Sequence, residues 1–272
     1  MRYTDHHVHT KYSPDSDASI GAYLIRAKEL KLEKVIFTDH IDMGAIESQF
    51  QKHIDYHEYF KSMKKLEKEY EIPIKIGVEI GYERNYKEKI DDFLNKYPFD
   101  FVIAALHYGD GKDFYLGDFF KGKSQHQAYL RYFELVLEMV ENFNNFDVLG
   151  HLDHIVKYGP FKDKTYDYTK YKKIIDDILW ALIKKGKGIE LNTSGLRSKL
   201  KTTFPKEGVL KRYQELGGQV ITIGSDAHFN RDYYAGILQG MELLKSLGFS
   251  QISSFSHRRV KQLDISKGLD LK

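Results

Sequence analysis

Residues 219–228 read QVITIGSDAH, a short apolar run typical of a buried strand followed at once by two candidate metal ligands. The chain opens on a similar pattern, DHHVH, which contains His7 and His9. Side chains two positions apart on a strand point to the same side, so these two histidines could reach one metal ion. The same holds for Asp226 and His228. Together the two stretches indicate a site for more than one metal ion.

Short β-rich runs alternate with longer amphipathic segments along the whole chain. This alternation predicts an α/β fold built from βα units around a parallel sheet. A length of 272 residues is near the usual size of one α/β barrel, so we expect a single domain over residues 1–272. The expected strands are 2–6, 34–38, 74–78, 101–106, 147–150, 188–191 and 219–224. The clearest helices are expected at 19–30, 169–185 and 232–247.

Composition narrows the class of protein. The formal net charge is +3, which is too balanced to indicate a nucleic-acid or membrane partner. The chain has no cysteine, so any transition metal must be held by histidine and carboxylate side chains. Neither a signal peptide nor an apolar run long enough to span a bilayer is apparent. We therefore expect a soluble, cytoplasmic protein; nothing in the sequence predicts an oligomeric state.

Candidate ligands follow six of the seven expected strands. In parallel βα barrels the carboxyl ends of the strands form one face, so residues far apart in the sequence would meet there. A single histidine after a strand is more often a surface or hydrogen-bonded core residue than a ligand. Repetition at the same position in five different βα units favours a metal site. In chain order the candidates are His7, His9, Asp39, His40, Glu79, His107, His151, Asp226 and His228.

Other histidines fit this site less well. His53 and His57 have the spacing of a helical zinc pair, but the intervening residues lack the glutamate of an HExxH motif. We interpret them as an exposed helix face, with a lip on the substrate side of the site as the less favoured alternative. We also expect four further histidines to stay out of the metal coordination sphere: His6, His126, His154 and His257.

The motifs resemble those of the polymerase and histidinol phosphatase (PHP) superfamily. They occur in its order and span nearly the whole chain: His7-Val8-His9 with Asp15, Thr38-Asp39-His40, Gly77-Val78-Glu79, Leu106-His107, Gly150-His151-Leu152-Asp153 and Gly224-Ser225-Asp226-Ala227-His228. The run 190–197, ELNTSGLR, is similar to that of the monofunctional histidinol-phosphate phosphatases.

This resemblance implies a distorted seven-stranded (β/α)7 barrel that holds three divalent metal ions at the carboxyl ends of the strands. By motif, the first metal would bind His7, His9 and Asp226. The second would bind His107 and His151, with Glu79 bridging the two. The third would bind Asp15, His40 and His228. Zinc, iron and manganese all suit such donors.

A shared carboxylate at Glu79 also makes sense without the family, because two close dications need an anion between them. Aspartates 39 and 153 lie beside ligands and suit the orientation of histidine rings. We count Arg197, Asp226 and Glu79 as the catalytic residues. Arg197 could grip a phosphate group in bidentate fashion, although a salt bridge at the barrel rim would also explain it. Lys157 is a second candidate for binding the phosphate.

The expected activity is hydrolysis of L-histidinol phosphate, a small-molecule phosphomonoester, by a metal-bridging hydroxide that attacks phosphorus. Two alternatives stay open. A PHP phosphoesterase acting on another phosphomonoester, a nucleotide or a nucleic-acid end would use the same site. A metal-binding domain without catalysis belongs to a different class, and loss of ligands would be its mark.

Overall fold

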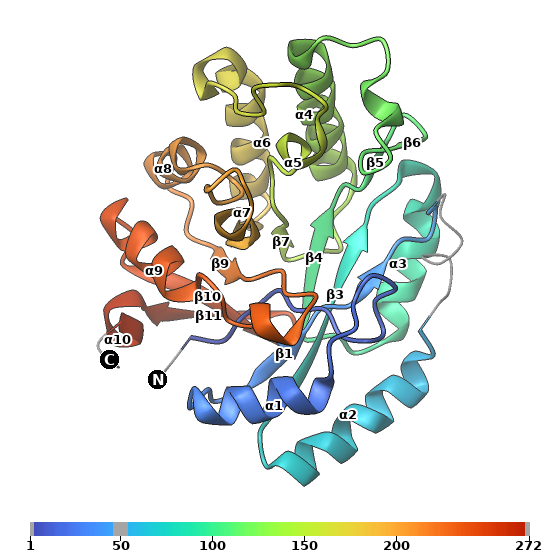
Figure 1. Ribbon diagram of the computed structural model, residues 1–272, viewed down its shortest axis with the longest axis vertical. Helices are drawn as coiled ribbons and strands as arrows, with labels where there is room; N and C mark the ends of the chain where they lie inside the picture. The colour runs from blue at the N-terminus through green and yellow to red at the C-terminus, as the bar shows by residue number, and fades with distance from the viewer. Residues whose placement is uncertain (1–2, 46–53, 270–272) are drawn as a thin grey trace.

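The computed structural model describes residues 3–45 and 54–269, and it confirms the barrel-like α/β fold (Figure 1). A curled, parallel sheet runs in the order β1, β3, β4, β7, β8, β9, and β2 pairs with β3. Its strands are β1 Val35–Phe37, β2 His40–Ile41, β3 Ile74–Gly81, β4 Phe101–Ala105, β7 Val148–Leu149, β8 Gly188–Asn192 and β9 Ile221–Gly224.

Helices surround this sheet (Figure 1). They are α1 Ile20–Glu29, α2 Tyr56–Tyr70, α3 Lys87–Lys96, α4 Gln125–Asn142, α5 Ile155–Tyr158, α6 Lys172–Lys184, α7 Ser194–Arg197, α8 Glu207–Glu215, α9 Ile237–Ser246 and α10 Ile265–Leu269. None of the helices within the described ranges is both long and apolar enough to cross a membrane.

The first expected strand does not form as predicted. Residue 2 lies outside the described ranges, and residues 3–6 form no strand. The segment still closes the barrel, because His6 donates its N–H to Ile223 of β9 at 3.1 Å and Val8 accepts from Thr38 beyond β1 at 2.8 Å. A side chain also takes the place of a backbone acceptor here, because the Asp5 carboxylate accepts the N–H of Ser225 at 2.8 Å. The seventh strand of the sheet is instead β2.

Strands β1 and β2 are two halves of one interrupted strand, since both pair with β3. Val35 lies opposite Ile74, and His40 lies opposite Glu79. This register has a consequence for the site. His40 and Glu79 were expected just beyond their strands, but both belong to paired strands and are neighbours across the ladder.

Amphipathic helices form where the sequence places an apolar stripe. In α4 the buried residues Tyr129, Phe133, Val136 and Val140 recur every three or four positions and face the core. The helix starts at Ser124, whose capping box with Gln127 satisfies free N–H groups.

Two of the three expected helices have shifted starts. Helix α1 matches the expected 19–30 with Ser19 as its cap. Helix α6 begins at Lys172, after a turn of 3-10 helix. Helix α9 begins at Ile237, because Gly236 adopts φ +80° and interrupts helical geometry before it.

Two antiparallel hairpins lie outside the main sheet and were not predicted. β5 Tyr108–Gly109 pairs with β6 Lys112–Asp113, directly after the end of β4. β10 Gln251–Ser256 pairs with β11 Arg259–Asp264. The first hairpin bears on the functional site, because it follows His107 in the chain.

Candidate metal centre

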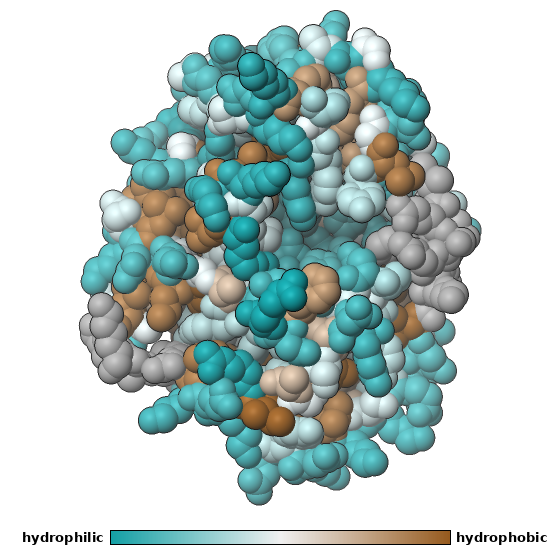
Figure 2. All heavy atoms as spheres, viewed as in Figure 1, coloured by the Kyte–Doolittle hydropathy of each residue, from teal (hydrophilic) through white to brown (hydrophobic). Residues whose placement is uncertain are grey.

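A cavity of about 280 Å³ opens at the carboxyl ends of the parallel strands. Figure 2 shows a hollow at the centre of this face, surrounded mainly by hydrophilic residues. Seven of the nine predicted metal ligands line it, namely Asp15, His40, Glu79, His107, His151, Asp226 and His228. His7 and His9 are fully buried beneath them.

The first predicted ligand group comes together as expected. Nε2 of His7 lies 3.7 Å from Oδ1 of Asp226, and Nε2 of His9 lies 3.4 Å from the same oxygen. No hydrogen-bond partner in the described ranges engages either of these buried Nε2 atoms. Two unengaged imidazole nitrogens beside a carboxylate are donors that suit a divalent transition metal.

The second group surrounds Glu79, whose two carboxylate oxygens face different histidines. Oε1 lies 2.8 Å from Nε2 of His151 and 3.5 Å from Nε2 of His107. Oε2 lies 3.2 Å from Nε2 of His7 and 3.4 Å from Nε2 of His9. Glu79 therefore stands between the first and second groups and offers one oxygen to each.

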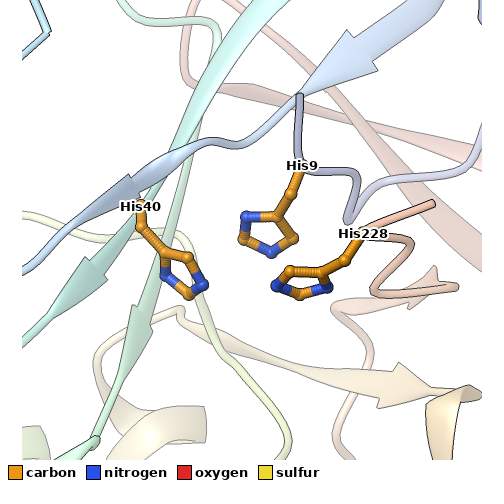
Figure 3. Close-up of side chains that lie close together, drawn as sticks. All are labelled: His9, His40 and His228. Atoms are coloured by element: carbon orange, nitrogen blue, oxygen red, sulfur yellow. The ribbon is translucent and has the colours of Figure 1, made fainter. Parts of the chain in front are cut away.

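The third group lies at the mouth of the cavity. Oδ2 of Asp15 is 3.1 Å from Nε2 of His228 and 3.6 Å from Nε2 of His40. Figure 3 shows the rings of His40, His228 and His9 side by side, and the centroid of the His9 ring is 4.2 Å and 4.1 Å from those of the other two. His9 thus adjoins both the first and the third groups.

Two predicted ligands have strained backbones. His151 has φ +23° and Asp226 has φ +55°, both outside the regions that side-chain-bearing residues prefer. Asp226 is held there by its N–H, which donates to the carbonyl of His7 at 2.8 Å. Such strain concentrates at functional sites, where the surrounding fold over-determines the position of a side chain.

Charges within the cluster keep the buried carboxylates ionised. Burial raises the pKa of Glu79, but His7 and His40 outweigh that effect and hold the pKa well below its ordinary value. The pKa of Asp226 is lowered in the same way, chiefly by His7 against the effect of burial. Burial, with His228 and His40 nearby, lowers the pKa of His9 well below its ordinary value. Carboxylates and neutral imidazoles are the protonation states that bind metals. Burial lowers the pKa of His7 and of His40, but Glu190 and Glu79 outweigh that effect and hold both pKa values well above the ordinary value. Metal binding at these two rings would therefore release protons.

Three side chains orient the histidine rings. Glu190 lies 2.6 Å from Nδ1 of His7, and Asp42 lies 2.6 Å from Nδ1 of His107. Nδ1 of His9 lies 3.1 Å from the Ser13 hydroxyl. In each case the opposite ring nitrogen faces the cluster. Such contacts fix the tautomer and the direction of a metal-binding imidazole.

Sequence reasoning missed these three residues. The sixth expected strand was assigned no role at the metals, yet it carries Glu190. The available signal was a buried glutamate inside the apolar strand GIELN, which requires a polar partner.

The two predicted orienting aspartates have different outcomes. Asp39 accepts the Ser13 hydroxyl at 2.7 Å and so supports His9 through one intermediary. Asp153 instead accepts the hydroxyl of Tyr166 at 2.8 Å and the N–H of Lys206 at 3.0 Å. The prediction that Asp153 orients a histidine ring is wrong, because its hydrogen bonds go to Tyr166 and Lys206. The turn after β7 directs this side chain away from the cavity and into the core.

The two candidate phosphate ligands occupy different positions. Lys157, on α5, lines the cavity. Arg197 is not among the lining residues: its Nη2 donates to the carbonyl of Ser225 at 2.7 Å, and Nε lies 3.5 Å from Asp232. Nη1 is buried and makes no hydrogen bond within the described ranges. Arg197 therefore contacts the backbone beside Asp226.

Five histidines were expected to stay out of the metal coordination sphere in addition to His53, which lies outside the described ranges. His6 points away, with Nδ1 2.6 Å from the carbonyl of Thr4. His57, His126 and His257 are exposed. His154 differs, because it is 5% exposed yet lines the cavity, with its ring centroid 4.1 Å from that of His151.

Comparison with known proteins decides the family. A model described as PHP domain matches residues 5–194. The chain belongs to the PHP family. A histidinol-phosphatase of Lactococcus lactis is 33% identical over 263 residues, which cover 96% of this chain and 97% of that protein. A probable histidinol-phosphatase of Clostridium acetobutylicum is 33% identical over 228 residues, covering 83% and 86%.

A solved structure agrees with this assignment. The Lactococcus lactis histidinol phosphate phosphatase, complexed with zinc, L-histidinol and phosphate, matches with a TM-score of 0.87 and 31% identity, covering 96% of this chain and 99% of that chain. This PHP chain is an enzyme of the phosphatase class and belongs with the histidinol-phosphatases of the family.

Proposed function

We propose that this PHP enzyme hydrolyses L-histidinol phosphate to L-histidinol and phosphate, in histidine biosynthesis. The observation that carries the proposal is the position of Glu79, one oxygen of which faces His7 and His9 while the other faces His107 and His151. This arrangement suits two metal ions that share a carboxylate. Such two-metal sites are common in enzymes that hydrolyse phosphate esters.

We assign the metals as the motifs imply. His7, His9 and Asp226 would hold the first ion, His107 and His151 the second with Glu79 between them, and Asp15, His40 and His228 the third. The donor set of histidine and carboxylate suits zinc, iron or manganese. When bound, these ions would lower the pKa of a shared water molecule and neutralise charge on the phosphate oxygens.

The side chains themselves supply orientation. Glu190 and Asp42 fix the rings of His7 and His107, so that their Nε2 atoms point toward the cluster before any ligand arrives. Preorganised groups need not move during the reaction, which is the main source of electrostatic catalysis. Lys157, in the cavity wall, would place a positive charge beside the phosphate group.

Arg197 has two possible contributions to this reaction. We retain its role as a phosphate ligand, because Nη1 has no hydrogen bond within the described ranges. Its contact with Ser225 would also steady the strained backbone at Asp226. The two roles make different predictions for phosphate binding and for metal content.

A steady-state comparison tests the substrate. We would measure kcat/KM for L-histidinol phosphate, a panel of other phosphomonoesters, mononucleotides and a labelled oligonucleotide. These ratios report differential binding of the transition states, and we expect histidinol phosphate to lead by roughly tenfold or more. Equal or faster hydrolysis of nucleotides or oligonucleotide would contradict the proposal. Metal-loaded protein that is inert toward every ester would favour a non-catalytic domain.

A further inference from the structure

Among the described residues, one carboxylate of the cavity lacks the basic partner that the others have. The carboxylates that line it are Asp15, Asp42, Glu79, Asp113 and Asp226. Four lie near a histidine nitrogen: Asp15 at 3.1 Å from His228, Asp42 at 2.6 Å from His107, Glu79 at 2.8 Å from His151 and Asp226 at 3.4 Å from His9. Within residues 3–45 and 54–269, Asp113 forms no ion pair.

Asp113 is also fixed in place. It is 4% exposed and lies on β6, opposite Tyr108 of β5. Its Oδ1 accepts the N–H of Leu116 at 2.8 Å, and no hydrogen bond within the described part of the chain engages Oδ2. The next residue, Phe114, donates its N–H to the carbonyl of His107 at 3.3 Å. The hairpin thereby holds the carboxylate close to the wall that carries His107.

Aromatic rings stand on the same wall. Tyr115 follows Asp113 by two residues, lines the cavity and is 74% exposed, which is unusual for so large a side chain. Its ring meets that of Tyr158 edge to face, with centroids 6.0 Å apart and planes at 86°. Tyr158 lines the cavity as well. An aromatic pair of this kind offers a packing surface to a planar ligand group.

A buried carboxylate without a cation is unfavourable, and a ligand cation would offset that cost. In L-histidinol phosphate the amine is attached to the carbon next to the ester-bearing carbon, so its ammonium group enters the cavity with the phosphate. We propose that Asp113 binds this ammonium group and that Tyr115 and Tyr158 pack against the imidazole ring. The inference rests on the proposed function, and it makes the substrate class amine-bearing phosphate esters with a planar side chain.

The variant Asp113→Asn tests the assignment, because its amide oxygen can still accept the N–H of Leu116. We would compare kcat/KM for L-histidinol phosphate with that for the same ester lacking its amine. Loss of a charged hydrogen-bond partner predicts that the ratio of the two values falls roughly tenfold to a hundredfold. Asp110→Asn is the matched control, since Asp110 lies in the turn of the same hairpin and pairs with Arg131 at 2.8 Å, away from the cavity.

Direct binding supplies a second readout. Calorimetry should show weaker L-histidinol binding in Asp113→Asn by the same factor, with inorganic phosphate affinity little changed. Tyr115→Ala, at an exposed position, should also weaken L-histidinol binding. This second variant leaves Asp113 unchanged, so it tests the aromatic contact separately. Equal losses on both esters would overturn the role of Asp113. Unchanged L-histidinol binding in both variants would overturn the whole inference.

Failure of the proposed function would look different. Wild-type enzyme that prefers nucleotides over histidinol phosphate would contradict the function and, with it, this inference. Wild-type enzyme that prefers histidinol phosphate, combined with an unchanged ester ratio in Asp113→Asn, would contradict the inference alone.

Discussion

The carboxylate of Glu190 accepts a hydrogen bond at 2.6 Å from Nδ1 of His7, with both side chains fully buried. The same carboxylate accepts the backbone N–H of His151 at 2.9 Å. Glu190 therefore connects predicted ligands of two different metals. A residue outside the set of predicted metal ligands thus helps to set the geometry of the cluster.

Replacing Glu190 by alanine should weaken metal binding. The ring of His7 would lose the acceptor that fixes its tautomer, and such losses typically cost tenfold to a hundredfold in metal affinity, roughly. Competition with a chromophoric chelator measures this affinity. The surface variant Glu58→Ala serves as the control. If both variants bind metal like the wild type, Glu190 does not orient His7.

The variant Arg197→Ala should lower kcat/KM for histidinol phosphate by roughly a hundredfold, as expected for loss of a charged group that stabilises the transition state. A phosphate ligand predicts weaker inhibition by inorganic phosphate with the metal content retained. A role confined to the backbone at Ser225 predicts unchanged inhibition by inorganic phosphate and a lower metal content. Arg26→Ala, on the exposed face of α1, is the control. Unchanged kcat/KM would exclude both roles.

The raised pKa of Asp153 predicts that the stability of the fold depends on pH. Burial raises its pKa from 3.8 to about 6, although hydrogen bonds from Lys206 and Tyr166 oppose the increase. The folded state therefore holds this proton more tightly than the unfolded chain, so its contribution favours folding at low pH. That contribution is lost as pH rises from about 4 to about 6, on the order of 3 kcal/mol in total.

The variant Asp153→Asn should remove this dependence, because an amide does not ionise. We would measure denaturant unfolding of metal-free protein at several pH values and compare the two stability curves. Between pH 4 and 6, the wild type should lose stability relative to the variant as the pH rises. Parallel curves would show that Asp153 does not titrate with a raised pKa.

The sequence predicted the barrel, and it predicted that the candidate ligands at the strand ends would meet, because strand ends converge whatever their loops contain. Asp15 follows no strand and was expected only from the family resemblance. The sequence could not predict the β10–β11 hairpin. In the turn between these strands, His257 and Arg258 adopt φ +50° and +62°. An Asn-Gly pair is the usual sequence signal for such a turn, and this chain lacks one there. Arg258 is held there by Asp147 at 2.7 Å and by the carbonyl of Asp100 at 2.9 Å, which are contacts distant in sequence.

Two of the three orienting residues, Asp42 and Glu190, escaped prediction for a similar reason. Asp42 and His107 are 65 residues apart, and Glu190 and His7 are 183 apart. Only the closed sheet brings them together. Asp153 shows the converse: adjacency to His151 suggested a role at the metals, but the turn after β7 directs its side chain toward Tyr166.

Metal stoichiometry tests the proposed cluster of three metal ions, two of which would share Glu79. Protein purified without chelators would be measured by elemental analysis, and metal-free protein would be titrated with zinc and manganese. We predict two to three equivalents in the purified protein, three at saturation, and fewer in Glu79→Ala. Metal-free protein with full phosphatase activity would show that the enzyme does not depend on such a cluster.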